Sequence, residues 1–302
     1  MDILVTGGTV FVSRAVAEYF VQRGDRVYVL NRGSRQAPSG TTLIQADRRC
    51  LGDLLKKYCF DAVLDMTAYS GDDVRSLLDA LGDVGQYVLL SSSAVYPETL
   101  PQPFSERQPV GRNCRWGDYG IGKIDAETEA LRVFPDSYII RPPYLCGKGN
   151  NLYRESFIFE CAERGVPVCL PERSNLRLQF CCVSELCRLI EAIILTHPSA
   201  HILNIGDSKP VSAEEWIRIC SDIAGADCDI RYAPADIEIR NYFPFRDYNY
   251  ALDGSEASKI SAYTTALEQS LQSGYDWWKC HRDEVIRKPY IDFIVNHLPM
   301  LT

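Results

Sequence analysis

The first half of the chain alternates short, continuously apolar runs with longer segments in which apolar residues recur at helical spacing. This spacing predicts helices near residues 15–23 and 74–81. Strands that are short and apolar throughout are typical of a parallel sheet covered by helices on both faces. The apolar runs lie at residues 3–6, 26–30, 42–45, 62–65 and 87–92. The order therefore predicts an α/β fold with a doubly wound parallel sheet.

The pattern loosens beyond residue 147. A strand at residues 137–141 precedes predicted helices near 154–164 and 185–195 and a strand-like run at 178–183. The apolar run at residues 202–206 suits a strand that returns to the main sheet. We therefore expect a first domain over residues 1–146, to which the segment near 183–206 returns, and a smaller mixed α/β domain over residues 147–302.

The composition indicates a globular protein with a substantial core. The chain has 302 residues, of which 46% are hydrophobic, and a formal net charge of −8 at pH 7. An acidic surface does not attract phosphate backbones or anionic lipids over long distances, which makes nucleic acid a less favoured partner. No apolar run reaches the length of a membrane span, and the N-terminus reads as a strand rather than a charged leader. We expect a cytoplasmic enzyme with no membrane partner.

Cysteine and histidine suggest no metal site. The twelve cysteines include no Cys-x-x-Cys pair, and the four histidines are scattered without the spacing of metal ligands. In a cytoplasmic protein, buried free thiols that act as small hydrophobic side chains are the simplest interpretation.

The segment between the first strand and the first helix lies where a dinucleotide fold binds pyrophosphate on a helix N-terminus. A Thr-Gly-x-x-Gly-x-x-Gly pattern needs three glycines, but this chain has Gly7, Val10 and Ser13 at those positions. Val10 threatens the close approach of phosphate to the backbone, and a tight turn without a ligand is the alternative. The candidate cofactor contacts in this loop are Thr6, Gly7, Gly8, Thr9, Val10, Phe11 and Val12.

The second strand ends in Asn31-Arg32, where an acidic side chain would accept the ribose hydroxyls of NAD. Asn31 does not repel a 2′-phosphate, and Arg32, with Arg35, is able to pair with it. This favours NADP over NAD, although NAD stays possible and the arginines could simply form a solvated loop. Asp47 and Arg48, after the third strand, are candidates for the edge of the adenine.

Three Tyr-x-x-x-Lys strings place a phenol and an ammonium on one side of a helical turn: Tyr119/Lys123, Tyr144/Lys148 and Tyr275/Lys279. The second lies in a segment rich in proline and glycine, and the third in an aromatic stretch near the C-terminus. Only the first follows a buried strand that ends in serines, at residues 91–93. We therefore select Tyr119 and Lys123 as the functional pair.

Together these features resemble the extended short-chain dehydrogenase/reductase superfamily, in particular its NAD-dependent epimerase/dehydratase branch, over most of the chain. The matching segments are the glycine loop, Ser91-Ser-Ser-Ala-Val-Tyr96, Tyr119-x-x-x-Lys123, Arg141-Pro-Pro143, residues 147–150 and residues 179–183. The resemblance implies a Rossmann-type first domain that binds NAD(P) and a second domain that binds substrate. It also implies a homodimer formed through the helices near residues 74–81 and 125–133.

The resemblance further assigns chemistry to individual residues. Ser92 is expected to orient a substrate hydroxyl, Tyr119 to act as the acid/base, and Lys123 to hold the nicotinamide ribose. Tyr119 and Lys123 thus also count as cofactor contacts, and Pro142 is expected to lie near the nicotinamide. Lowering a phenol pKa from 10 to near 7 needs roughly 4 kcal/mol, which Lys123 and an oxidised nicotinamide are expected to supply together.

The expected substrate is a hydroxyl-bearing, sugar-like molecule, and the reaction is an epimerisation, a dehydration or a reduction. Enzymes of this type that act on nucleotide sugars carry an arginine at the position of Leu178, so a nucleotide sugar is less favoured here but stays possible. Arg154 or Arg173 could replace that arginine. The candidate substrate contacts are Ser93, Arg154 and Gln179.

Part of the C-terminal half also resembles the chloroplast stem-loop binding proteins and their bacterial relatives, which are associated with RNA. The similar segments are residues 243–248, 257–260 and Trp277-Trp278. The acidic charge and the absence of a stripe of alternating basic and aromatic residues speak against RNA binding. An RNA-associated protein and an NADP-sensing protein without turnover are therefore the alternatives to an enzyme.

Overall fold

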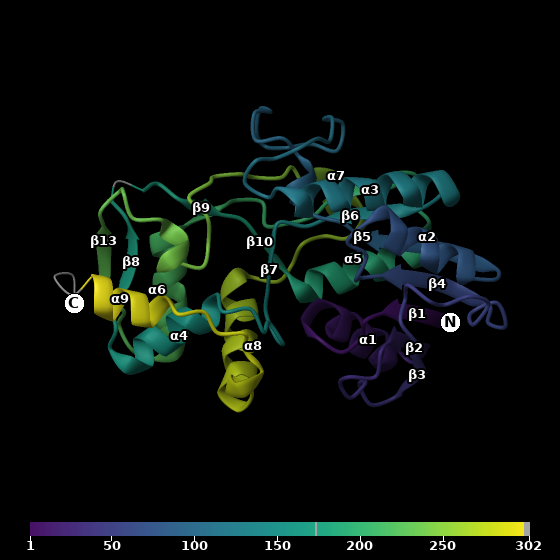
Figure 1. Ribbon diagram of the computed structural model, residues 1–302, viewed down its shortest axis with the longest axis horizontal. Coiled ribbons are helices and arrows are strands. Elements are labelled where there is room, and N and C mark those ends of the chain that lie inside the picture. Colours follow the sequence, from purple (N-terminus) through teal and green to yellow (C-terminus); the bar gives the residue numbers. More distant parts are fainter. Residues whose placement is uncertain (173, 299–302) are drawn as a thin grey trace.

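The computed structural model describes residues 1–172 and 174–298. Its centre is a parallel sheet of seven strands in the order β11-β6-β5-β4-β1-β2-β3. Figure 1 shows this sheet in the right half of the molecule. The predicted doubly wound α/β fold is confirmed. The strands are β1 (Asp2–Thr6), β2 (Arg26–Asn31), β3 (Thr41–Gln45), β4 (Phe60–Asp65), β5 (Val84–Leu90), β6 (Tyr138–Arg141) and β11 (Ile202–Asn204).

Helices cover both faces of the sheet. On one face lie α1 (Phe11–Arg23) and α5 (Val183–Thr196), and on the other lie α2 (Gly71–Ala80) and α3 (Asp118–Val133). Within β1, Ile3 and Val5 pack into the first of these hydrophobic layers and Leu4 into the second. Side chains alternate between the faces of a strand, so a strand buried on both faces must be apolar at every position. This explains the continuous apolar runs.

Most of the remaining elements form the left half of the molecule in Figure 1, whereas α7 lies in the right half, against β11 and α5. Three small two-stranded pairings occur among these elements, β7 with β10, β8 with β13 and β9 with β12. Short 3-10 helices lie at η1 (Ser93–Val95), η2 (Ile239–Asn241) and η3 (Arg282–Glu284). The elements are β7 (Tyr144–Cys146), α4 (Glu155–Arg164), β8 (Val168–Pro171), β9 (Arg177–Leu178), β10 (Phe180–Cys182), β12 (Val211–Ser212), α6 (Ala213–Ala224), β13 (Ile230–Ala233), α7 (Ser255–Ile260), α8 (Leu267–Cys280) and α9 (Tyr290–His297).

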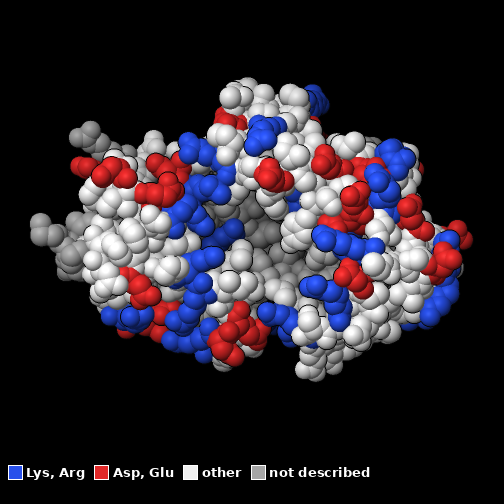
Figure 2. Space-filling model, viewed as in Figure 1, with Lys and Arg blue, Asp and Glu red and all other residues white. Residues whose placement is uncertain are grey.

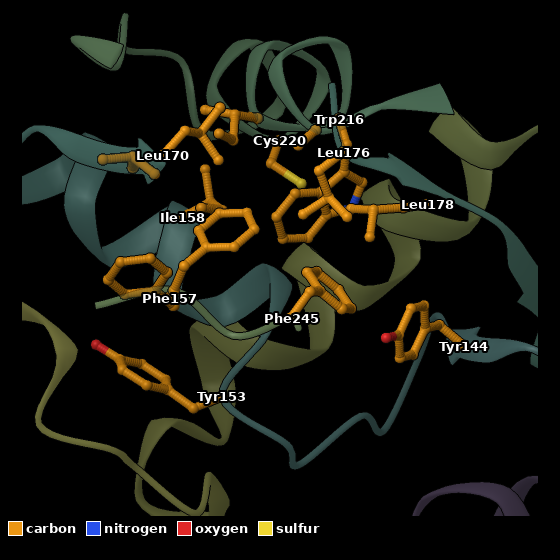
Figure 3. Packing of buried hydrophobic residues seen from close by; sticks show 14 of the residues in the cluster. Tyr144, Tyr153, Phe157, Ile158, Leu170, Leu176, Leu178, Trp216, Cys220 and Phe245 are labelled. Carbon is orange, nitrogen blue, oxygen red and sulfur yellow. The ribbon is translucent and has the colours of Figure 1, made fainter. Parts of the chain in front are cut away.

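The left half has its own hydrophobic core, which is rich in aromatic rings. Trp216, Phe243 and Phe245 are buried there, and Leu178 packs into the same cluster. Figure 3 shows Phe245 within this cluster and Tyr144 at its margin. Most of the aromatic residues of the C-terminal half therefore serve packing. In the described ranges, no helix is long and apolar enough to cross a membrane.

Candidate active site

A cavity of about 390 Å³ lies at the carboxyl ends of β4, β5 and β6, between the sheet and the C-terminal half. Figure 2 shows the molecule hollowed at its centre. Parallel strands bring loops that are distant in the sequence to the same sheet edge, where open α/β folds bind their ligands. The wall is built from residues 10–13, 66, 67, 69, 90–93, 116, 119, 123, 142–145, 151, 152, 154 and 250.

The glycine loop leads from β1 into α1. Gly8 has φ +72°, and a Cβ there would meet the Val29 side chain at 2.5 Å, so both backbone and space require glycine. Val10 precedes α1 with φ −136° and ψ 134°, an extended conformation that valine adopts without strain. Ser13 donates from Oγ to the Val10 carbonyl at 3.0 Å. Val10 and Ser13 thus fit their own positions without strain, but the next residue, Phe11, has a positive φ of 39°, which is unusual for a residue with a side chain. Val10 and Phe11 both line the cavity.

Several predicted cofactor contacts instead make a buried network beneath the loop. Thr6 donates from Oγ1 to Asp65 at 2.8 Å and accepts from the Met66 amide at 2.9 Å. Arg48 donates to both carboxylate oxygens of Asp65, at 2.9 and 2.8 Å. Burial alone would raise the pKa of Asp65, but Arg48 outweighs it and holds that pKa below its usual range. The prediction that Arg48 edges the adenine is not supported, because its guanidinium is directed inward.

Asn31 also has an internal role. Its Nδ2 donates to the Gly7 carbonyl at 2.8 Å, and its Oδ1 accepts from the Gly33 amide at 2.8 Å. The side chain thus joins the glycine turn to the next turn. The neighbouring Arg32 and Arg35 are exposed, and Asp47 accepts from the Arg49 amide at 3.0 Å.

The helix α3 carries Tyr119 and Lys123 one turn apart and brings both to the cavity beside Ser92. Ser92 follows β5, and its Oγ accepts from the Ala94 amide at 3.2 Å. A Cβ at Gly122 would lie 2.2 Å from the Tyr69 carbonyl oxygen, so glycine at this position permits α3 to approach the loop after β4 closely. The glycines of the Tyr-Gly-Ile-Gly-Lys string therefore set the depth at which the pair sits.

Lys123 is buried and held by two backbone carbonyls. Its Nζ donates to Ala68 and Leu90, each at 2.8 Å. An ammonium has three N–H donors, so one is left for the cavity that Lys123 lines. Burial is the main cause that lowers the pKa of Lys123 to about 8, against the attraction of the Asp65 and Glu127 carboxylates.

Tyr119 lines the cavity, although 44% of the residue is exposed. Burial raises the pKa of its phenol above the usual value, while the Ser92 hydroxyl and the Arg154 guanidinium act in the opposite direction. Lys123 is not among the causes that lower this pKa in the protein alone. The expected lowering was assigned to Lys123 together with an oxidised nicotinamide, and it stays a prediction.

The three candidate substrate contacts divide between two places. Ser93 and Arg154 line the cavity, as does the cofactor candidate Pro142, whose carbonyl accepts from the Ser93 amide at 2.9 Å. Gln179 is not among the lining residues. Its Nε2 donates to Asp207 and Leu252 carbonyls at 2.8 and 3.0 Å, so the prediction for Gln179 is not supported. Arg173 lies outside the described residues.

The other two Tyr-x-x-x-Lys strings do not bring their tyrosine and lysine together at the cavity. Tyr144 lines the cavity, but its partner Lys148 contributes to a different surface hollow. Lys279 pairs with Asp276 at 3.2 Å and lies 4.7 Å from the ring centroid of Tyr275, on α8. Neither pair therefore presents a phenol and an ammonium to one cavity.

Sequence reasoning missed several aromatic residues of the wall, namely Tyr69, Trp116 and Tyr250. Trp116 precedes Tyr119 by three residues, so the sequence could have indicated that it lies near the site. Tyr250 had no such signal, because it reaches the cavity from a distant segment. Within the described residues, no cluster of His, Cys, Asp and Glu is arranged as a metal site.

Comparison with known proteins gives both a family and a fold. Residues 3–206 match the model of the NAD dependent epimerase/dehydratase family. The chain is 24% identical over 281 residues to the chloroplast stem-loop binding protein of 41 kDa b from Arabidopsis thaliana, covering 85% of this chain and 73% of that protein. It is 26% identical over 159 residues to UDP-glucose 4-epimerase from Erwinia amylovora, covering 42% of this chain and 47% of that protein.

Solved structures share the fold at low sequence identity. A UDP-glucose 4-epimerase from Thermotoga maritima, solved with UDP-glucose, has a TM-score of 0.78 and 17% identity, with 93% of this chain and 99% of that chain covered. A dTDP-glucose 4,6-dehydratase from Bacillus anthracis, solved with NAD, has a TM-score of 0.77 and 16% identity, with 94% and 98% covered. The family expected from the motifs is confirmed: the chain belongs to the NAD dependent epimerase/dehydratase family.

Proposed function

We propose that the protein is an NAD(P)-dependent epimerase, dehydratase or reductase that oxidises a secondary hydroxyl of a sugar-like substrate to a transient ketone. The observation that carries this proposal is that Ser92, Tyr119 and Lys123 line one cavity. The first turn of α1, at Phe11, lines the same cavity and is suited to a diphosphate. Family membership supports the reaction class.

The residues of the glycine loop fit a dinucleotide. Val10, the residue before α1, places no side-chain cap on the helix, and the first turn of α1 carries no acidic residue. The amides of this turn are therefore suited to a diphosphate, to which Thr9 and the neighbouring backbone could contribute. The solved dehydratase and other similar structures contain NAD. NADP remains our proposal for the preferred cofactor, because Arg32 is exposed where a 2′-phosphate would need a cation.

The proposed proton transfer runs from the substrate hydroxyl to Tyr119, with Ser92 orienting that hydroxyl. When bound, an oxidised nicotinamide supplies a hydride acceptor and a positive charge. That charge would favour the phenolate and so act against the rise in the pKa of Tyr119 that burial causes. Lys123 contributes its remaining N–H, which is suited to a ribose hydroxyl or to the phenol oxygen, and its two carbonyl partners hold it in place.

The decisive experiment is mass spectrometry of nucleotide released from denatured, purified protein, followed by titration with NAD and NADP. We expect one of them to be present or to bind. Absence of both, in the preparation and in the titration, would falsify the proposed activity.

Tyr119→Phe tests the base separately. The variant should lose about 10² to 10⁴ in turnover, because a positioned base contributes that much, and should still bind the cofactor. Ser92→Ala is the matched comparison for Tyr119→Phe, because it should reduce turnover while the base at Tyr119 is kept. Undiminished turnover of Tyr119→Phe would eliminate the proposed role.

An RNA-associated function is the second candidate, and the similarity to the Arabidopsis stem-loop binding protein favours it. It predicts tight RNA binding that persists at physiological salt and does not depend on Tyr119. A filter-binding assay at several salt concentrations, with wild type and Tyr119→Phe, distinguishes it from the enzyme.

We also propose a cytoplasmic homodimer that associates through α2 and α3, and a division into domains near residue 146. The division assigns α5 and β11, which complete the sheet and its cover, to the first domain. Light scattering of the purified protein tests the dimer, and a monomeric mass at micromolar concentration would contradict it.

A further inference from the structure

Two buried cysteines lie side by side at the junction between the sheet and the C-terminal half. In the parallel pair of β7 and β10, Cys146 is the register partner of Cys182. Figure 1 shows these two strands next to each other near the centre of the molecule. Neighbouring strands lie about 4.8 Å apart, which is within the range of about 4.4 to 6.8 Å between the Cα atoms of a disulfide. The backbone therefore holds the two cysteines at a separation that a disulfide bond spans.

The side chains of this pair also share one face of the two-stranded sheet. Cys146 and Cys182 belong to the aromatic cluster of the C-terminal half, whereas Cys181 packs into the layer of α1 and α5. Cys146 donates from Sγ to the Ser270 hydroxyl at 3.6 Å. The same hydroxyl also contacts the Cys182 thiol. The two sulfur atoms therefore meet beside Ser270.

The surroundings of Cys182 favour its thiolate. Cys182 directly precedes the helix α5, whose N-terminal amides stabilise an anion. A hydrogen bond from the Cys146 thiol is the main cause that lowers the pKa of Cys182; burial opposes it, and the hydroxyls of Ser270 and Tyr263 support it. The same contact and burial raise the pKa of Cys146. Cys182 is therefore the better nucleophile, and Cys146 keeps its proton.

A second hollow gives a small oxidant a route to the pair. It has a volume of about 530 Å³ and lies between α1, α5 and α8. Ser270, which contacts both thiols, lines this hollow, and so does Val183, the neighbour of Cys182. Cys146 and Cys182 are themselves 0% exposed, so the route suits only a molecule of nearly the size of water. Cys187 lines the hollow as well, but burial raises the pKa of its thiol to about 12, which makes it the less reactive target.

We propose that Cys146 and Cys182 form a site of reversible oxidation, at which a hydroperoxide such as hydrogen peroxide converts the two thiols into a disulfide between β7 and β10. The Cys182 thiolate attacks one peroxide oxygen, the O–O bond breaks, and the departing hydroxide takes up the proton that Cys182 released. The Cys146 sulfur then attacks the sulfenic acid: the S–S bond forms, the S–O bond breaks, and the hydroxyl leaves with the Cys146 proton as water. The two thiols lose two electrons in total, and the peroxide gains them.

The strand that carries Cys146 also forms part of the active cavity. Tyr144 and Leu145 line that cavity and directly precede Cys146 on β7. A disulfide bond requires the two sulfur atoms to come closer than non-bonded contact, so β7 shifts toward β10 when the bond forms. Oxidation therefore changes the wall on which the substrate is expected to lie. This consequence rests on the proposed function, whereas the oxidation of the two cysteines does not.

The test is peptide mapping by mass spectrometry of the full chain, which is first reduced, then treated with hydrogen peroxide under native conditions and blocked with N-ethylmaleimide. We expect a peptide pair that is joined through Cys146 and Cys182 and that dithiothreitol separates. This linkage should form at least about tenfold faster than Cys187 is oxidised, because each unit of pKa is a tenfold difference in thiolate.

Three variants assign the roles of the two thiols. Cys146→Ser removes the thiol that closes the disulfide, so Cys182 should accumulate as a sulfenic acid that a dimedone probe labels. Cys182→Ser should abolish both the linked peptide and the label. Cys181→Ser is the matched control, because Cys181 is equally buried on the same strand but faces the other layer, and it should leave the linkage unchanged. Circular dichroism of each variant confirms that it is folded.

Titration of the reduced and the oxidised protein with NADP measures the effect on the cavity. We expect the two affinities to differ by about fivefold or more, the lower end of typical coupling between sites. In Cys182→Ser, treatment with peroxide should leave the affinity unchanged.

Absence of the linked peptide from native protein whose exposed cysteines are oxidised overturns the inference, as does a linkage that forms only after unfolding in urea. A disulfide from Cys182 to a different cysteine does so too. Equal NADP affinities of the oxidised and the reduced protein overturn the effect on the cavity. If NADP binds to neither form, the proposed function fails instead, and the peptide mapping still decides on the oxidation site.

Discussion

The buried ammonium of Lys123 makes stability depend on pH in a way that a single substitution removes. Burial lowers the pKa of Lys123 from 10.5 to about 8, which corresponds to a destabilisation of the charged form by about 3 kcal/mol. Below pH 8 the fold carries this whole cost, because lysine is charged in both the folded and the unfolded state. Between pH 8 and 10.5 only the unfolded state holds the proton, so the free energy of unfolding rises with pH.

Lys123→Met removes the titrating group while keeping most of its apolar volume. It also leaves the Ala68 and Leu90 carbonyls without their donor, which costs about 1 to 3 kcal/mol each when the groups are buried. The variant should therefore be destabilised most at high pH and least near pH 7, where loss of the buried charge offsets the lost hydrogen bonds.

Urea unfolding at several pH values from 7 to 10 measures the effect as the difference in unfolding free energy between wild type and Lys123→Met. Other titrating groups cancel in this difference, which should grow by about 2 to 3 kcal/mol across the range. Lys279→Met is the control, because Lys279 is an exposed partner of Asp276 and should show a flat difference. A flat difference for Lys123→Met as well would refute the reasoning.

Two further predictions concern the cofactor and the placement of α3. Arg32→Gln should weaken NADP binding about tenfold and leave NAD binding within about twofold, because only the 2′-phosphate loses a charged partner. Fluorescence titration with both reduced cofactors measures the two affinities. An equal loss of affinity for both cofactors would contradict the prediction. Gly122→Ala should destabilise the protein by more than about 1 kcal/mol, since its Cβ would lie 2.2 Å from the Tyr69 carbonyl oxygen. Gly254→Ala, where the nearest atom is 3.5 Å away, is the matched control in thermal unfolding, and equal melting temperatures would count against the close approach.

Much of the fold was accessible from local pattern. Continuous apolar runs such as residues 3–6 predicted strands buried on both faces, and the structure places alternate residues of β1 in two different hydrophobic layers. The segments of the C-terminal half were harder to assign. Their strands have only two to four residues, as in β9 and β13, so little periodicity marks them.

The residues of the candidate site were also only partly predictable from the sequence. Ser92, Tyr119 and Lys123 were identified by spacing and order, and all three lie in the cavity. Asn31 and Gln179 carry polar groups that are equally suited to binding a ligand, yet both form their hydrogen bonds with other groups of the protein. No feature of the sequence distinguishes these two cases, because the partners of a buried amide come from distant segments.

The sequence by itself determined the parallel sheet, the family and the order of the Ser-Tyr-Lys residues, since these depend on short-range periodicity and on spacing along the chain. Only the tertiary structure decided which side chains face the cavity. Arg48 became an internal partner of Asp65, whereas Arg154 came to line the cavity over Tyr144. The physical reason is that a buried polar or charged group must find its partner in space, and that partner is set by the packing of distant elements rather than by neighbours in the chain.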